Sequence, residues 1–64
     1  MAYEKILYSL EHGVAHVSLN DPETRNAVSR DLGEELIDAL RRASVEARAV
    51  LLTGEGKGFC SGAN

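Results

Sequence analysis

The chain has 64 residues, of which 44% are apolar and 27% charged, a balance typical of a soluble globular protein. A net charge of −3 argues against nucleic acid or an anionic membrane as the main partner, and no apolar run approaches the roughly 20 residues of a membrane span. The single cysteine excludes an internal disulfide, and chains below about 70–80 residues seldom bury a sufficient core, so we expect part of a larger fold or half of a complex.

Two runs of alternating side chains predict an antiparallel hairpin at the start of the chain. The strands are expected at residues 4–10 and 14–19, and Gly13 supplies the positive φ that the turn over residues 11–13 needs. On the first strand Ile6, Tyr8 and Leu10 share one face, and on the second strand Ala15, Val17 and Leu19 share one face.

A helix is predicted over residues 30–43, after a connection rich in turn formers at residues 20–26. Ser29 is the expected N-cap, and Gly33 is a discordant residue that indicates a close contact with the sheet or with the preceding loop. The apolar stripe expected to face the core consists of Leu32, Leu36, Ile37, Leu40 and Ala43.

The third strand is predicted over residues 48–53, after residues 44–47 leave the helix. Its unbroken apolar centre is typical of a parallel strand that is covered on both faces. The order strand, strand, helix, strand therefore indicates an α/β fold in which a helical crossover leads to a parallel strand.

A glycine-rich loop follows that strand, at a position where α/β proteins commonly bind ligands. It does not match the P-loop, because Gly58 follows Lys57 and Leu52 stands where the first glycine belongs, and it does not match the dinucleotide-binding pattern. From composition alone, a mobile turn is an equally good interpretation. Cys60 is expected to be a small packing residue, and His12 and His16 lack a third metal ligand.

Four segments in order carry a resemblance to a known family. They are Asn20-Asp21-Pro22, Arg25-Asn26-Ala27-Val28, Val50-Leu51-Leu52-Thr53-Gly54 and Gly58-Phe59-Cys60-Ser61-Gly62-Ala63-Asn64. On these segments the chain resembles the N-terminal portion of the crotonase, or enoyl-coenzyme A (CoA) hydratase/isomerase, superfamily. Asp21 and Asn64 depart from residues common in the family, which leaves the subfamily open. The resemblance implies a crotonase-like ββα superhelix, with residues 1–64 as the N-terminal fragment of a single domain.

The resemblance also implies an acyl-CoA site. The backbone N–H of Ala63 would be one of two donors of an oxyanion hole for a thioester enolate, with Gly62 and Ser61 beside it. Arg25 would approach the ribose phosphate, and the carbonyl groups of Ser61 and Ala63 would accept from the adenine amino group. The second donor and the acid/base carboxylates would lie beyond residue 64. No metal and no cofactor other than the CoA of the substrate is implied.

The expected activity of the intact protein is that of an enoyl-CoA hydratase or isomerase of fatty acid metabolism, a lyase or isomerase in the cytoplasm. Alternatives are another thioester reaction on the same scaffold (hydrolysis, dehalogenation or carbon–carbon cleavage) or a small non-catalytic binding module. The expected partners are acyl-CoA, the remainder of the same fold in the same or a separate chain, and further copies in a trimer or hexamer. Neither nucleic acid nor a membrane is expected.

Overall fold

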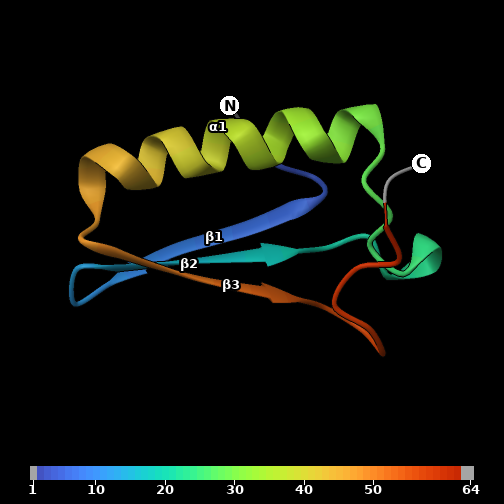
Figure 1. The fold of residues 1–64 in the computed structure, drawn as a ribbon. Helices are drawn as coiled ribbons and strands as arrows, with labels where there is room; N and C mark the ends of the chain where they lie inside the picture. Colours follow the sequence, from blue (N-terminus) through green and yellow to red (C-terminus); the bar gives the residue numbers. More distant parts are fainter. Residues whose placement is uncertain (1, 63–64) are drawn as a thin grey trace.

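A three-stranded sheet with one long helix across a face makes up residues 2–62, the part of the chain that the computed structural model describes (Figure 1). Strands β1 (Ile6–Glu11) and β2 (Val14–Leu19) are antiparallel, and β2 runs parallel to β3 (Ala49–Gly54) in the sheet order β1-β2-β3. A short 3-10 turn, η1 (Pro22–Thr24), precedes helix α1 (Arg30–Glu46). The predicted α/β order of hairpin, helix and parallel strand is confirmed.

The hairpin turns over two residues with left-handed backbone, His12 at φ 53° and Gly13 at φ 78°. Positive φ at both central positions is the hairpin turn whose twist matches the strands. β1 begins two residues later than predicted because the N–H groups of Glu4 and Lys5 donate to Glu35 Oε1 on the helix, at 2.8 and 2.9 Å. Leu10, which shares a face of β1 with Ile6, is 46% exposed because it lies at the end of the hairpin away from the core.

Helix α1 begins as predicted, because the Ser29 side chain accepts from the N–H of Leu32 at 3.2 Å. It ends at Glu46, three residues later than predicted. Glu46 holds this last turn in place, because its carboxylate accepts from Arg42 Nε at 3.2 Å and from the Tyr8 hydroxyl at 2.9 Å. A tertiary contact to β1 therefore extends a helix whose local sequence indicates an earlier end.

The buried stripe of the helix agrees with the prediction at Leu32 and Ala43, and Leu36 packs against the core as predicted, but Ile37 and Leu40 do not face the sheet. Leu32, Ala39 and Ala43 face the sheet, whereas Ile37 is 53% exposed and Leu40 is also exposed. Two alanines on the inner face allow the helix to lie close to the strands, and this orientation turns the larger pair outward. The core consists of Ile6, Val17, Leu19, Leu32 and Ala39, with Tyr3, Tyr8, Val28, Leu36 and Cys60 packed around it.

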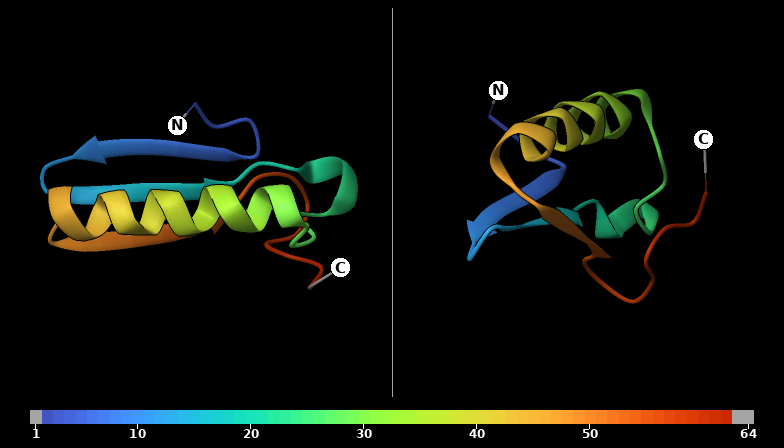
Figure 2. Two further views of the ribbon diagram at one scale, coloured as in Figure 1. Left: turned by 90° about the horizontal axis from the view of Figure 1, so that it is seen from above. Right: turned by 60° about the vertical axis from the view of Figure 1, so that its left-hand side comes forward.

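β3 lies at one edge of the sheet, and its side chains are open on both faces. It begins and ends one residue later than predicted, and its register with β2 pairs Ala15 with Val50 and Val17 with Leu52. The helix contacts β1 and β2, whereas β3 lies at the opposite edge of the sheet from β1 (Figure 2). Leu51 is 52% exposed, and Val50 and Leu52 are also exposed. The expected covering of this strand on both faces is not present within residues 2–62.

Candidate functional site

The connection after β2 and the loop after β3 meet at one end of the sheet (Figure 1). The parallel strands end together there, since Leu19 is the register partner of Gly54. This end carries the carboxyl termini of both strands, the position at which open α/β sheets bind ligands.

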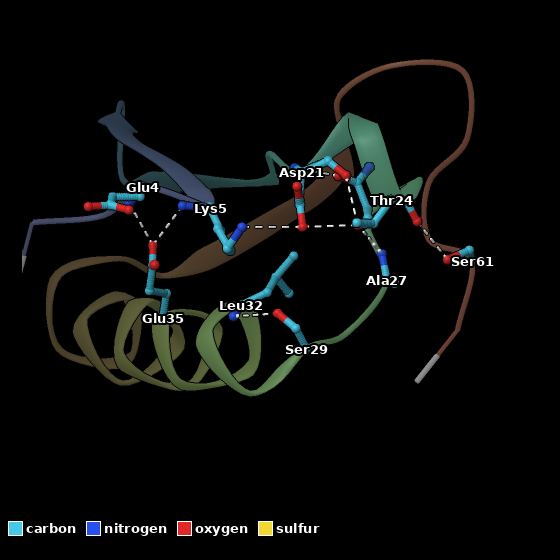
Figure 3. Close-up of polar contacts among 10 residues, drawn as sticks. Glu4, Lys5, Asp21, Thr24, Ala27, Ser29, Leu32, Glu35 and Ser61 are labelled. Atoms are coloured by element: carbon cyan, nitrogen blue, oxygen red, sulfur yellow. Dashed lines mark hydrogen bonds and ion pairs between the residues drawn. The ribbon is translucent and has the colours of Figure 1, made fainter. Parts of the chain in front are cut away.

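The connection is a tight turn around Asp21. Arg25 and Asn26, the two residues after η1, both have left-handed backbone, at φ 55° and 59°. The Asp21 carboxylate accepts from Thr24 Oγ1 at 2.9 Å and from Lys5 Nζ at 3.4 Å (Figure 3). Asp21 therefore stabilises the turn from within, through Thr24, and joins it to the segment before β1, through Lys5.

Three hydrogen bonds join this turn to the end of the glycine-rich loop. The N–H of Ser61 donates to the Arg25 carbonyl at 2.8 Å, and the N–H of Val28 donates to the Gly62 carbonyl at 2.9 Å. The Ser61 hydroxyl donates to the Thr24 carbonyl at 3.0 Å (Figure 3). Arg25, Ser61 and Gly62, predicted to share a site, thus lie side by side, whereas Ala63 lies outside the described residues.

Arg25 contributes its backbone to this arrangement and leaves its side chain in solvent. Its guanidinium has no ion-pair or hydrogen-bond partner within residues 2–62, so its charge is not used internally by the described part of the chain. Gly62 has φ 112°, a backbone conformation that residues with a side chain rarely adopt. Its carbonyl is already occupied by Val28, while within residues 2–62 no donor reaches the Ser61 carbonyl.

Asn26 is the residue of this site that sequence reasoning did not single out. It is completely buried, and its Nδ2 atom donates to the carbonyls of Glu55, Gly58 and Phe59 at 2.9, 3.1 and 2.9 Å. The only available signal was its type and place, because asparagine tolerates left-handed backbone and carries both donors and an acceptor.

At Gly54, the last residue of β3, the need for glycine is explained by contacts within the protein. A Cβ there would lie 2.9 Å from Asn26 Nδ2 and 2.9 Å from Phe59 Cα, and closest of all to the Phe59 carbonyl oxygen. The loop folds back directly over this glycine. Glycine at position 54 is therefore required by the protein's own packing, without any ligand.

The side chains with shifted pKa values lie elsewhere, where β1 meets the helix. The pKa of Tyr8 is raised, mainly by burial and next by its hydrogen bond to Glu46. The pKa of Glu46 is lowered, mainly by the hydrogen bond from the Tyr8 hydroxyl and further by the hydrogen bond from Arg42. Arg42 also stacks on the Tyr8 ring, 4.3 Å from its centroid. The hydrogen bond to Asp38 raises the pKa of Tyr3. These groups join the helix to β1 and to the segment before it, and in the described part of the chain they make no hydrogen bond to the glycine-rich loop.

The remaining candidates have structural surroundings. Cys60 is half-buried against the core, which confirms its packing role, and its Sγ accepts weakly from the N–H of Gly62 at 3.4 Å. His16 Nε2 lies 2.7 Å from Thr53 Oγ1 on the neighbouring strand. Within residues 2–62, no cluster of acidic, histidine and cysteine side chains is placed to hold a metal ion. Over the same residues, no helix combines the length and apolar character needed to cross a bilayer.

Comparison with known proteins supplies the family. A probable enoyl-CoA hydratase of Rhodobacter capsulatus is 47% identical over 62 residues, which cover 97% of this chain and 24% of that protein. A probable enoyl-CoA hydratase of Mycobacterium tuberculosis is 41% identical over 64 residues, 25% of its length. The chain thus spans about a quarter of the length of these curated relatives.

Solved structures agree with this assignment. An enoyl-CoA hydratase/isomerase from Mycobacterium paratuberculosis superposes on 98% of this chain with a TM-score of 0.93 and 32% identity, using 24% of its own chain. An enoyl-CoA hydratase/isomerase from Xanthobacter autotrophicus Py2 covers 95% with a TM-score of 0.88 and 40% identity. The family description "Enoyl-CoA hydratase/isomerase" matches residues 9–64. The chain therefore belongs to the enoyl-CoA hydratase/isomerase family, and its hairpin, helix and parallel strand form the N-terminal portion of the crotonase fold.

Proposed function

We propose that this chain is the acyl-CoA-binding part of an enoyl-CoA hydratase/isomerase, in which the backbone N–H of Ala63 stabilises the oxygen of a thioester enolate. The observation that supports this most directly is the bonding of Ser61 and Gly62 to the turn at Arg25 and Val28, because it fixes the backbone that leads into residue 63. A preorganised N–H aimed at a developing oxyanion lowers a barrier by about 2.7–4 kcal/mol. No metal and no cofactor other than substrate CoA is needed for this step.

Arg25 is proposed to bind the ribose phosphate of CoA. Its guanidinium is exposed and has no partner within residues 2–62, and a guanidinium is always charged and can bind a phosphate through two parallel hydrogen bonds. The Ser61 carbonyl, adjacent to the Arg25 backbone, is proposed to accept from the adenine amino group. Arg25, Ser61, Gly62 and Ala63 then line one binding site.

The acid/base groups and the second oxyanion donor are proposed to come from the remainder of the domain, in the same or a separate chain. Two features support this: the curated relatives are about four times as long as this chain, and β3 exposes apolar side chains on both faces. Among the reactions of the family, hydration is favoured because these relatives are named probable enoyl-CoA hydratases. A trimeric or hexameric assembly and a cytoplasmic location stay predictions.

The oxyanion role is tested in a chimera that joins this chain to the remaining three quarters of the R. capsulatus relative. Ala63→Pro deletes the N–H and should lower kcat for a short enoyl-CoA by about 10²–10³-fold. Cys60→Ala is the control and should leave kcat within about twofold, since Cys60 is a packing residue. An active proline variant would refute the role of residue 63.

The phosphate contact is tested by binding, independently of turnover. Arg25→Gln should weaken CoA binding by about tenfold or more and leave binding of dephospho-CoA unchanged, because only CoA carries the ribose phosphate. Arg41→Gln, at an exposed arginine in helix α1, is the matched control and should change neither affinity. Equal losses for CoA and dephospho-CoA would remove the phosphate assignment.

A further inference from the structure

Every polar atom of the Asn26 side chain is used inside the protein. Oδ1 accepts from the N–H of Asp21 at 2.7 Å, and the backbone N–H of Asn26 donates to the Asp21 carbonyl at 2.8 Å. The residue is 0% exposed, so these bonds are shielded from water. Asn26 is thus fixed rigidly within its own turn, with its amide nitrogen aimed at the opposite loop.

That nitrogen is the centre around which the glycine-rich loop folds. Its two hydrogens serve three carbonyls, those of Glu55, Gly58 and Phe59, so that at least one hydrogen is shared between two acceptors. Glu55 opens the loop, where its own N–H donates to the Leu19 carbonyl of β2 at 2.8 Å. One side chain therefore fixes both the entry and the exit of the loop.

The loop exit leads directly into the candidate site. Phe59 is followed by Cys60 and then by Ser61 and Gly62, whose backbone bonds to Arg25 and Val28. Asn26 lies between those two turn residues in sequence. The same short segment thus holds the loop in two ways, through the buried side chain of Asn26 and through the backbone of Arg25 and Val28.

We propose that Asn26 is a positioning residue of the acyl-CoA site: its side-chain amide keeps the Ser61–Gly62 backbone in register with Arg25. The ligand half of this inference rests on the proposed function, whereas the geometric half does not. In this proposal Asn26 does not contact the ligand itself; it acts by holding the loop that does. A loop that is already ordered loses less conformational freedom when a ligand binds, which strengthens binding without any new contact.

The chemistry of the site favours asparagine over similar residues. Aspartate matches its shape and its acceptor, but it has no donor when ionised and would direct negative oxygen at three carbonyls. Glycine accepts the left-handed backbone at φ 59° and provides no side chain. Asn26→Asp and Asn26→Gly therefore remove the same three hydrogen bonds in two different ways.

The first test is amide hydrogen exchange of the 64-residue chain, measured by NMR. In both variants the N–H groups of Ser61 and Val28 should exchange at least about tenfold faster, while the N–H of Arg48, bonded to the Gly13 carbonyl at the far end of the sheet, should keep its rate. His12→Gly is the matched control, because His12 also has a left-handed backbone and is exposed in the hairpin turn. Unchanged exchange at Ser61 and Val28, or an equal rise at Arg48, would overturn the positioning role.

In the unsubstituted protein, the Asn26 side-chain amide protons should exchange at least about tenfold more slowly than those of Asn20, whose side chain has no bonded partner within residues 2–62. Equal exchange of the two side chains would also overturn the inference. This measurement needs no variant and does not depend on variant folding.

The second test is the Kd for CoA of the unsubstituted protein and of the variants, measured at a temperature at which all of them are folded. Asn26→Asp should raise the Kd for CoA about tenfold, and His12→Gly should not change it. A loss of thermal stability with an unchanged Kd would show a purely structural residue and overturn the inference. If the unsubstituted chain and the chimera bind no CoA, the proposed function fails, while the exchange experiment still decides whether Asn26 positions the loop.

Discussion

Substitution of Gly54 by alanine gives the sharpest test of the loop packing. The added Cβ would lie 2.9 Å from Phe59 Cα and 2.9 Å from Asn26 Nδ2, closer than Cβ atoms are found to such neighbours. Phe59 Cα belongs to the backbone, so that relief requires the loop to move away. This movement breaks the hydrogen bond from Asn26 to the Phe59 carbonyl, and water cannot replace that bond because Asn26 is fully buried.

The expected loss of stability follows from two costs. Forcing a methyl group into a packed site costs about 1–3 kcal/mol. Each net hydrogen bond is worth about 0.5–1.5 kcal/mol, and at least one of the three bonds of Asn26 to the loop is broken. We therefore expect Gly54→Ala to lower the free energy of unfolding by about 2–4 kcal/mol.

The assay is urea unfolding followed by circular dichroism, with Gly33→Ala as the matched control. A Cβ at Gly33 would meet only Val28 Cγ1 at 3.6 Å, an ordinary contact, and alanine is the better helix former by about 1 kcal/mol. Gly33→Ala should therefore stabilise the chain while Gly54→Ala destabilises it. A loss below about 1 kcal/mol for Gly54→Ala would refute the packing argument, because the steric cost alone is at least about that value.

Two further expectations concern the helix. Leu32→Ala should cost about 2–5 kcal/mol because it empties a fully buried position, whereas Ile37→Ala should cost less than about 1 kcal/mol; equal losses in urea unfolding would contradict the observed helix orientation. The folded state lowers the pKa of Glu46 below its ordinary 4.5, so its contribution to stability is complete above that pH and is lost as the pH falls through the lower, folded value. Glu46→Gln should remove this part of the acid dependence of unfolding, and an unchanged pH profile would show that the Tyr8 and Arg42 contacts do not shift Glu46.

Periodicity and turn chemistry predicted most of the fold. The bounds of β2 and the Ser29 cap agree with prediction because both depend on local rules, alternation in one case and capping in the other. The errors have tertiary causes. Glu35 accepts hydrogen bonds from the N–H groups of residues 4 and 5, which delays the start of β1. Glu46 extends the helix because it accepts a hydrogen bond from the Tyr8 hydroxyl.

The buried helix stripe and the candidate site could be predicted only in part. Side-chain size favoured Ile37 and Leu40 as core residues, but Ala39 faces the sheet instead, beside the predicted Ala43, because small side chains permit close approach. Family resemblance brought Arg25, Ser61 and Gly62 into one predicted site, and the structure places them together. Asn26 belongs to one of the motifs that carry the resemblance, but its buried hydrogen bonds to Glu55, Gly58 and Phe59 could not be inferred from one sequence.

The open edge of β3 has a consequence for how this chain behaves in solution. Because the N–H of Glu55 points toward β2, alternation turns the peptide groups of Val50 and Leu52 toward the unpaired side. This strand, Ala49–Gly54, contains no charge and no proline, the features by which edge strands ordinarily resist joining other chains. Left uncovered, it is a template for sheet growth between molecules, and the risk of fibrils rises with concentration. A strand from the proposed remainder of the domain, if paired at this edge, would therefore also protect the chain against aggregation.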